Sequence, residues 1–110
     1  MIDDAGLLER TRQLLAEPLV EGDTLDAKVC HLIEAEYLRR LGHYRRVDIR
    51  LGQKYEMTFD EFVARHVARQ KGYTWEVESD AMEWETAISG INTLHRKLKE
   101  LRGVDNDLHR

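Results

Sequence analysis

The chain has 110 residues, of which 42% are hydrophobic and 35% are charged, and its formal net charge is −4. This composition is typical of a single helical domain and excludes a disordered or sheet-dominated chain. No apolar run approaches the ~18 residues that a membrane-spanning helix needs. The single cysteine, Cys30, excludes an internal disulfide framework, so we expect a cytosolic protein without membrane contact.

The first helix is predicted over residues 3–17, where leucines recur at helical spacing. These leucines are Leu7, Leu8, Leu14 and Leu15. Pro18 cannot continue a helix, so a connector is expected to follow as far as Gly22.

A second helix is predicted from Thr24 to about Glu56, with Asp23 and Thr24 as candidate N-caps. Its apolar stripe advances by three or four residues at every step: Leu25, Val29, Ile33, Tyr37, Leu41, Tyr44, Val47, Leu51 and Tyr55. Unbroken, this helix would be roughly 50 Å long at ~1.5 Å per residue. A compact chain of this size has a diameter of only about 34 Å. We therefore expect an elongated molecule unless Gly42 or Gly52 breaks the helix.

The segment Thr58–Glu61 matches a capping box, in which the threonine and glutamate side chains bond each other's backbone N–H groups. A short third helix is predicted after it, ending near Gly72. The residues expected to face inward are Phe59, Phe62, Val63 and Val67. Residues 73–77 alternate in polarity, so a brief strand remains an alternative there.

A fourth helix is predicted to begin near Ser79 or Asp80 and to end at Gly103. Its stripe alternates steps of three and four: Trp84, Ala87, Ile91, Leu94, Leu98 and Leu101. The fold class predicted is all-α, an elongated helical bundle of three to four helices dominated by a long antiparallel pair. A single domain is expected over 1–110, with an N-terminal helix and connector (1–22), a main bundle (23–102) and a frayed tail (103–110).

No catalytic or metal-binding motif is present. The five histidines are scattered, and His31 with Glu34 lacks the further ligands of a zinc or di-iron site. Neither serine stands in a nucleophile motif, and no glycine-rich phosphate loop exists. The sequence therefore predicts a binding protein without cofactor or metal and not an enzyme.

Basic residues lie along one edge of the second predicted helix, beside its tyrosines. Arg46, Arg50 and Lys54 form a candidate nucleic-acid face, since basic and aromatic groups together grip single strands. The alternative is that these bases are solvated or pair with the acids of the fourth helix. Net charge favours the alternative, because nucleic-acid-binding domains are usually basic throughout. Nucleic acid is thus not the expected partner.

The two tryptophans have different expected roles. Trp84 falls on the apolar stripe and is predicted to lie in the core. Trp75, with Tyr73 close by, precedes the helix among charged residues, where aromatic side chains often form interface hot spots. Core and interface both remain open for Trp75.

Two stretches resemble phrases of small bacterial antitoxin-like proteins. Residues 54–62 (KYEMTFDEF) are similar to "KYGM(S/T)FEEF", and residues 73–85 (YTWEVESDAMEWE) are similar to "Y(S/T)WEVESDAMDWE". Such proteins are encoded beside toxins of the TumE-like family. Glu56 stands where the first phrase has glycine, which favours a helix that continues through this position.

The resemblance implies a stoichiometric inhibitor that masks a toxin by binding it. We also expect a homo-oligomer, most simply a dimer, because the overhanging end of an unbroken second helix would be covered by a second copy or by a partner. The partner-binding residues that it suggests are Tyr73, Trp75, Glu76, Glu78 and Asp80, because toxins that hold RNA are often basic. A scaffolding helical protein with another partner is one alternative. A nucleic-acid-binding regulator of its own operon is the other, and its binding would fall steeply with salt.

Overall fold

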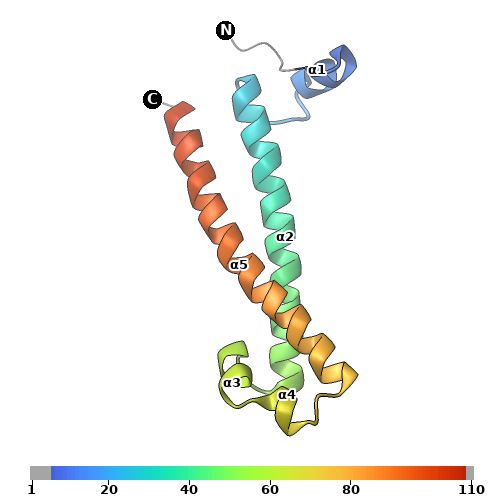
Figure 1. The fold of residues 1–110 in the computed structure, drawn as a ribbon. Coiled ribbons are helices and arrows are strands. Elements are labelled where there is room, and N and C mark those ends of the chain that lie inside the picture. The colour runs from blue at the N-terminus through green and yellow to red at the C-terminus, as the bar shows by residue number, and fades with distance from the viewer. Residues whose placement is uncertain (1–5, 109–110) are drawn as a thin grey trace. The chain divides into compact units, whose positions relative to one another are not determined.

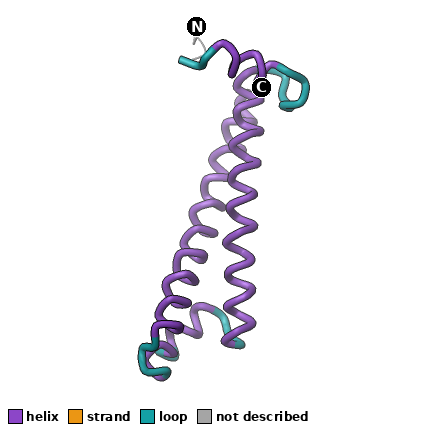
Figure 2. Tube along the Cα trace, turned by 90° about the vertical axis from the view of Figure 1, so that its right-hand side faces the viewer, coloured by secondary structure: helices purple, strands orange, loops and turns teal. Residues whose placement is uncertain are grey.

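The structure is a computed structural model that describes residues 6–108. Its elements are the helices α1 (Glu9–Ala16), α2 (Leu25–Tyr55), α3 (Phe59–Ala64), α4 (Val67–Gln70) and α5 (Trp75–Leu108), shown in Figure 1. No strand occurs among residues 6–108, as Figure 2 illustrates. The all-α class is therefore confirmed, as is the long helix pair, which is formed by α2 and α5.

The chain divides into two compact units. Unit 1 comprises Met1–Glu36 with Leu98–Arg110, and unit 2 comprises Tyr37–Lys97. Both long helices contribute residues to each unit, because each helix passes from one unit to the other. No helix of the described part is long and apolar enough to cross a membrane.

Helix α2 is continuous through Gly42 and Gly52. The hydroxyl of Thr24 accepts a bond from the N–H of Ala27 at 3.1 Å, as expected of an N-cap. The helix ends at Tyr55, where Glu56 adopts a left-handed backbone with φ of 54°. The bond from Met57 N–H to Gly52 C=O, 3.2 Å long, completes a Schellman motif around it. The expectation that the helix continues through Glu56 is therefore wrong, although glycine would adopt this conformation at lower cost.

The predicted third helix is divided in two, which is why five helices replace the expected three or four. The capping box between Thr58 and Glu61 is confirmed at the start of α3. His66, with φ of 53°, then separates α3 from α4. Phe62 and Val67 are buried as expected, but Val63 is 54% exposed. Val63 lies one residue, or about 100° around α3, from Phe62, so the two side chains face different directions.

Helix α4 ends where the sequence predicts. Gly72 has φ of 73°, and the N–H of Tyr73 bonds the carbonyl of Ala68 at 2.9 Å. This is a second Schellman motif, with glycine at its left-handed position.

Helix α5 begins earlier and ends later than the sequence suggests. Its first residue is Trp75, and the hydroxyl of Thr74 accepts a bond from the N–H of Val77 at 3.3 Å. The N-caps predicted at Ser79 or Asp80 are therefore wrong, and residues 75–77 are helical instead of forming a strand. At its other end α5 continues through Gly103 to Leu108. A single glycine costs only about 1 kcal/mol within a helix, so the predicted stop at Gly103 was not compulsory.

In unit 2 the two long helices pack antiparallel (Figure 1). The indole N–H of Trp84 donates to Asp48 at 2.8 Å, and Arg45 meets His95 at 3.0 Å. The residue of α2 that comes earlier in the sequence, Arg45, thus contacts the residue of α5 that comes later, His95. This order of contacts is that of two antiparallel helices. The buried residues of this unit are Leu41, Val47, Leu51, Phe62, Val67, Val77, Asp80, Trp84, Ala87 and Leu94.

Unit 1 has a smaller core, in which Ala27 and Leu98 are buried. Helix α1 buries none of its residues. It begins at Glu9 and not at residue 3; residues 6–8 are not helical, and residues 3–5 lie outside the described chain. The ammonium group of Lys28 donates to the carbonyls of Glu17 and Val20, at 3.0 and 2.6 Å, and so ties the connector to the start of α2.

Candidate functional site

An aromatic cluster fixes the α3–α4 end of unit 2. Trp84 is fully buried, and its ring centroid lies 5.2 Å from that of Phe62 and 5.4 Å from that of Phe59. The ring of Tyr55 stacks on that of Trp84 at 6.1 Å and meets that of Phe62 edge-on at 5.0 Å. The core role predicted for Trp84 is confirmed. Because these rings come from α2, α3 and α5, they hold the three helices together and position the surface residues around them.

A network of charged side chains crosses from α2 to α5 beside this cluster. The ammonium of Lys54 lies 2.6 Å from carboxylate oxygens of both Glu76 and Asp80, and the hydroxyl of Tyr55 donates to Asp80 at 2.6 Å. Asp80 is buried. The two bonds of Lys54 and the bond of Tyr55 all join residues of unit 2. The carboxylate of Asp80 therefore belongs to the interior, although the sequence placed it among the partner-binding residues.

The network shifts the pKa values of its members. Burial opposes ionisation of Asp80, but the bonds from Lys54 and Tyr55 outweigh it and hold the carboxyl pKa below its usual value. Burial and the bond to Asp80 raise the pKa of the Tyr55 phenol to about 12. The bonds to Asp80 and Glu76 raise the pKa of Lys54. Each shift favours the charged forms of Asp80 and Lys54 and the neutral form of Tyr55, which are the forms that make these bonds at neutral pH. The network therefore serves to link α2 to α5.

The candidate nucleic-acid face is largely occupied within the protein. Arg50 pairs with Glu83 at 2.6 Å, and Lys54 pairs with Glu76 and Asp80. Arg46 alone among the three makes no ion pair with residues 6–108. The alternative interpretation, that these bases pair with the acids of the last helix, is confirmed for Arg50 and Lys54.

The start of α5 presents large side chains that the core does not use. Trp75 is 84% exposed, Tyr73 is 57% exposed and Met82 is 70% exposed. Ala68 of α4, together with Ser79 and Ala81, completes an open groove of about 460 Å³ between these side chains. We call this group of residues the Trp75 surface. It retains Tyr73 and Trp75 from the predicted partner-binding set, and Glu78 of that set also lines the groove.

A second groove adjoins the Trp75 surface. It shares Ala68, Tyr73 and Ala81 with the first and extends over α3, where exposed Val63 lines it. Glu78 lines the first groove and Glu85 the second. Sequence analysis did not select Met82, Val63 or Glu85 for this surface. Met82 lies seven residues after Trp75, a spacing that places both on one helix face and could have revealed it.

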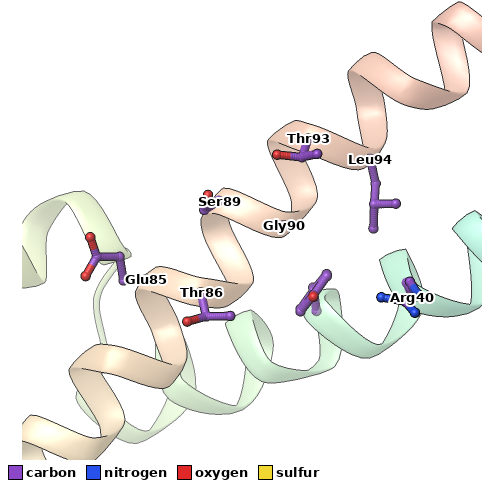
Figure 3. Close-up of a pocket in the computed structure, with 8 residues that line it drawn as sticks. Arg40, Glu85, Thr86, Ser89, Gly90, Thr93 and Leu94 are labelled. Carbon is purple, nitrogen blue, oxygen red and sulfur yellow. The ribbon is translucent and has the colours of Figure 1, made fainter.

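A further groove of about 540 Å³ lies between α2 and α5, on residues of unit 2 (Figure 3). Thr86, Ser89 and Thr93 bring hydroxyl groups from α5, and Arg40 contributes from α2. Gly90 also lines the groove, and a Cβ there would be only 2.4 Å from the ring of Tyr44. Gly90 thus permits the close approach of the two helices.

Histidine and cysteine side chains form no cluster suited to a metal within residues 6–108. His31 and Glu34 line a small groove of unit 1 with Cys30. Burial, assisted by the charge of Asp105, raises the pKa of the Cys30 thiol and so disfavours a reactive thiolate.

No protein family, no curated protein and no solved structure matches the chain.

Proposed function

We propose that this is a protein-binding protein that engages its partner through the Trp75 surface. The observation that carries the proposal is the 84% exposure of Trp75 beside exposed Tyr73 and Met82. Large apolar side chains cost free energy in water, and their grouping on one face is typical of interfaces. Tryptophan and tyrosine are also the residues that most often dominate binding energy.

The partner proposed is a toxin that the protein masks by stoichiometric binding. This part rests on the resemblance of residues 54–62 and 73–85 to antitoxin-like proteins. Masking requires a contact surface and neither cofactor nor catalytic group. In this proposal the protein acts in the cytosol and as a dimer.

Co-expression with the product of the neighbouring gene tests the proposal. We expect a stoichiometric complex on affinity purification and rescue of growth from that product's toxicity. Trp75→Ala should weaken the complex by about tenfold or more, because a central tryptophan commonly contributes 2 kcal/mol or more. Circular dichroism should stay unchanged, since Trp75 lies outside the core.

Ile49→Ala is the matched control, because Ile49 is also a large exposed side chain of unit 2 but lies on α2, outside both grooves. It should leave the affinity unchanged. Equal binding by both variants would contradict the assignment of the site. No complex and no toxicity would favour the scaffolding alternative.

The nucleic-acid-binding alternative has less support, because Arg50 and Lys54 are engaged by acids of α5. It would require DNA or RNA binding that weakens steeply as salt rises.

A further inference from the structure

One face of α5 carries both large apolar side chains and acidic side chains. Trp75, Glu78, Met82 and Glu85 follow one another at steps of three, four and three, so they form a stripe along the helix. All four are exposed, and each lines one of the two adjoining grooves. The stripe thus combines two acids with the apolar side chains of the Trp75 surface.

The acids of α5 between Trp75 and Glu85 fall into two sets that differ in their partners. Glu76, Asp80 and Glu83 pair with Lys54 or Arg50 of α2. Glu78 and Glu85, on the stripe, make no ion pair with any residue of the described chain. Two carboxylates thus flank the grooves without an ion pair among residues 6–108. Arg69 and His66 also line the second groove, but no ion pair joins either of them to Glu85 in the described part of the chain.

A second copy of the chain is a poor occupant for this stripe. In a two-fold symmetric contact the same patch meets itself. Centred on Met82, an antiparallel contact would bring Glu78 of one copy near Glu85 of the other. Like charges at an interface are repulsive, so the stripe disfavours self-association and favours a basic partner.

We propose that the stripe binds an amphipathic helix of a different chain, whose apolar side chains enter the two grooves and whose two basic residues meet Glu78 and Glu85. These acids are seven residues apart, which is two helical turns or ~10.5 Å along the axis. Basic residues at positions i and i+7 of a partner helix have the same separation. An apolar groove beside a helix is typical of helix-in-groove recognition. Addition of a peptide as a β-strand would need a sheet edge, which residues 6–108 do not contain. This inference rests on the proposed function and names the chemistry of the partner.

A pair of synthetic peptides tests the inference without the natural partner. Both are amphipathic helices with leucines on one face; one carries lysine at positions i and i+7, and the other carries glutamate there. We expect the lysine peptide to bind about tenfold more tightly by calorimetry, since each exposed pair or like-charge contact changes affinity a few-fold. The preference should shrink at high salt.

Charge reversal in the protein supplies the decisive comparison. Glu78→Lys with Glu85→Lys should reverse the preference toward the glutamate peptide. Glu56→Lys with Asp60→Lys is the control, because it changes the net charge by the same amount at exposed residues that line neither of the two grooves. This control variant should still bind the lysine peptide more tightly than the glutamate peptide.

Absence of binding by both peptides at millimolar concentration would overturn the inference, as would equal binding of both. These outcomes differ from failure of the proposed function, in which the neighbouring gene product forms no complex. If the complex with the neighbouring gene product survives Glu78→Lys with Glu85→Lys and neither peptide binds, the proposed function would be retained. The inference that the partner presents a basic amphipathic helix would then be rejected.

Discussion

Asp80 illustrates how a buried charge is accommodated in this protein. A carboxylate loses hydration when it is buried, and this loss is tolerable only if other groups bond to it. Lys54 and Tyr55 supply those bonds, each at 2.6 Å. Since Lys54 and Tyr55 lie in the last turn of α2 and Asp80 lies in α5, the network fixes the end of one long helix against the other.

Tyr55 gives the network a dependence on alkaline pH. The phenol pKa is raised to about 12 by burial and by the bond to Asp80, whereas the unfolded chain ionises near 10. The folded state therefore holds its proton longer than the unfolded state. The stabilisation is complete below pH 10 and is lost as pH rises toward 12. Lys54, whose pKa is also raised, contributes with the same sign.

We expect Tyr55→Phe to lower the free energy of unfolding by about 1–2 kcal/mol at neutral pH, because Asp80 loses a donor. The variant should also lose less stability than the natural protein between pH 10 and 12. Chemical denaturation across this range measures both effects. Tyr73→Phe, at an exposed tyrosine, is the control and should keep the natural pH profile; identical alkaline slopes for all three proteins would contradict the role of Tyr55.

At the level of helices, α2 and α5 approach each other closely where Gly90 of α5 faces the ring of Tyr44 of α2. A Cβ at Gly90 would lie 2.4 Å from Cε2 and 2.6 Å from Cδ2 of the Tyr44 ring. Such distances cannot be accommodated unless the ring or the helices move. Gly103, in the same helix, has no atom within 4 Å of the corresponding position.

Gly90→Ala and Gly103→Ala therefore form a matched pair. Alanine is favoured over glycine within a helix by about 1 kcal/mol, so Gly103→Ala should stabilise by up to that amount. At Gly90 the same gain is opposed by overpacking, which typically costs about 1–3 kcal/mol. We expect Gly90→Ala to be the less stable variant in urea denaturation. Equal gains from both substitutions would show that Tyr44 moves aside freely.

At the level of the whole molecule, buried side chains are distributed unequally between the two units. Of the eleven buried hydrophobic residues among residues 6–108, nine belong to unit 2, and the other two, Ala27 and Leu98, belong to unit 1. Helix α1 has no buried residue. Local unfolding is easiest where few apolar contacts resist it.

We expect native-state hydrogen exchange to follow this distribution. Backbone amides of α1 should exchange fastest among the helices, and those of α2 and α5 around Leu51 and Trp84 should exchange slowest. Mass spectrometry or NMR can measure the order. Protection of α1 equal to that of the aromatic cluster would contradict it.

Much of the fold could be predicted because its determinants lie close together in the sequence. Stripes with steps of three and four residues identified both long helices, and the capping box placed the start of α3. Left-handed residues were harder to predict, since nothing local marks Glu56 or His66 for that conformation. The predicted stop at Gly103 failed for a related reason: a glycine permits the end of a helix but does not impose it.

The candidate site was predicted in part. Tyr73 and Trp75 were identified from residue type and charged neighbours, and the 84% exposure of Trp75 excludes the core role that the sequence had left open. Periodicity, capping and composition, which are local properties, determined from sequence alone that this protein is helical and which stripes form its long pair. Only the tertiary structure decided that Asp80 is internal while Glu78 and Glu85 have no partner within the described chain. The physical reason is register: which acid of α5 meets which base of α2 depends on how two distant segments align, and no local pattern encodes that alignment.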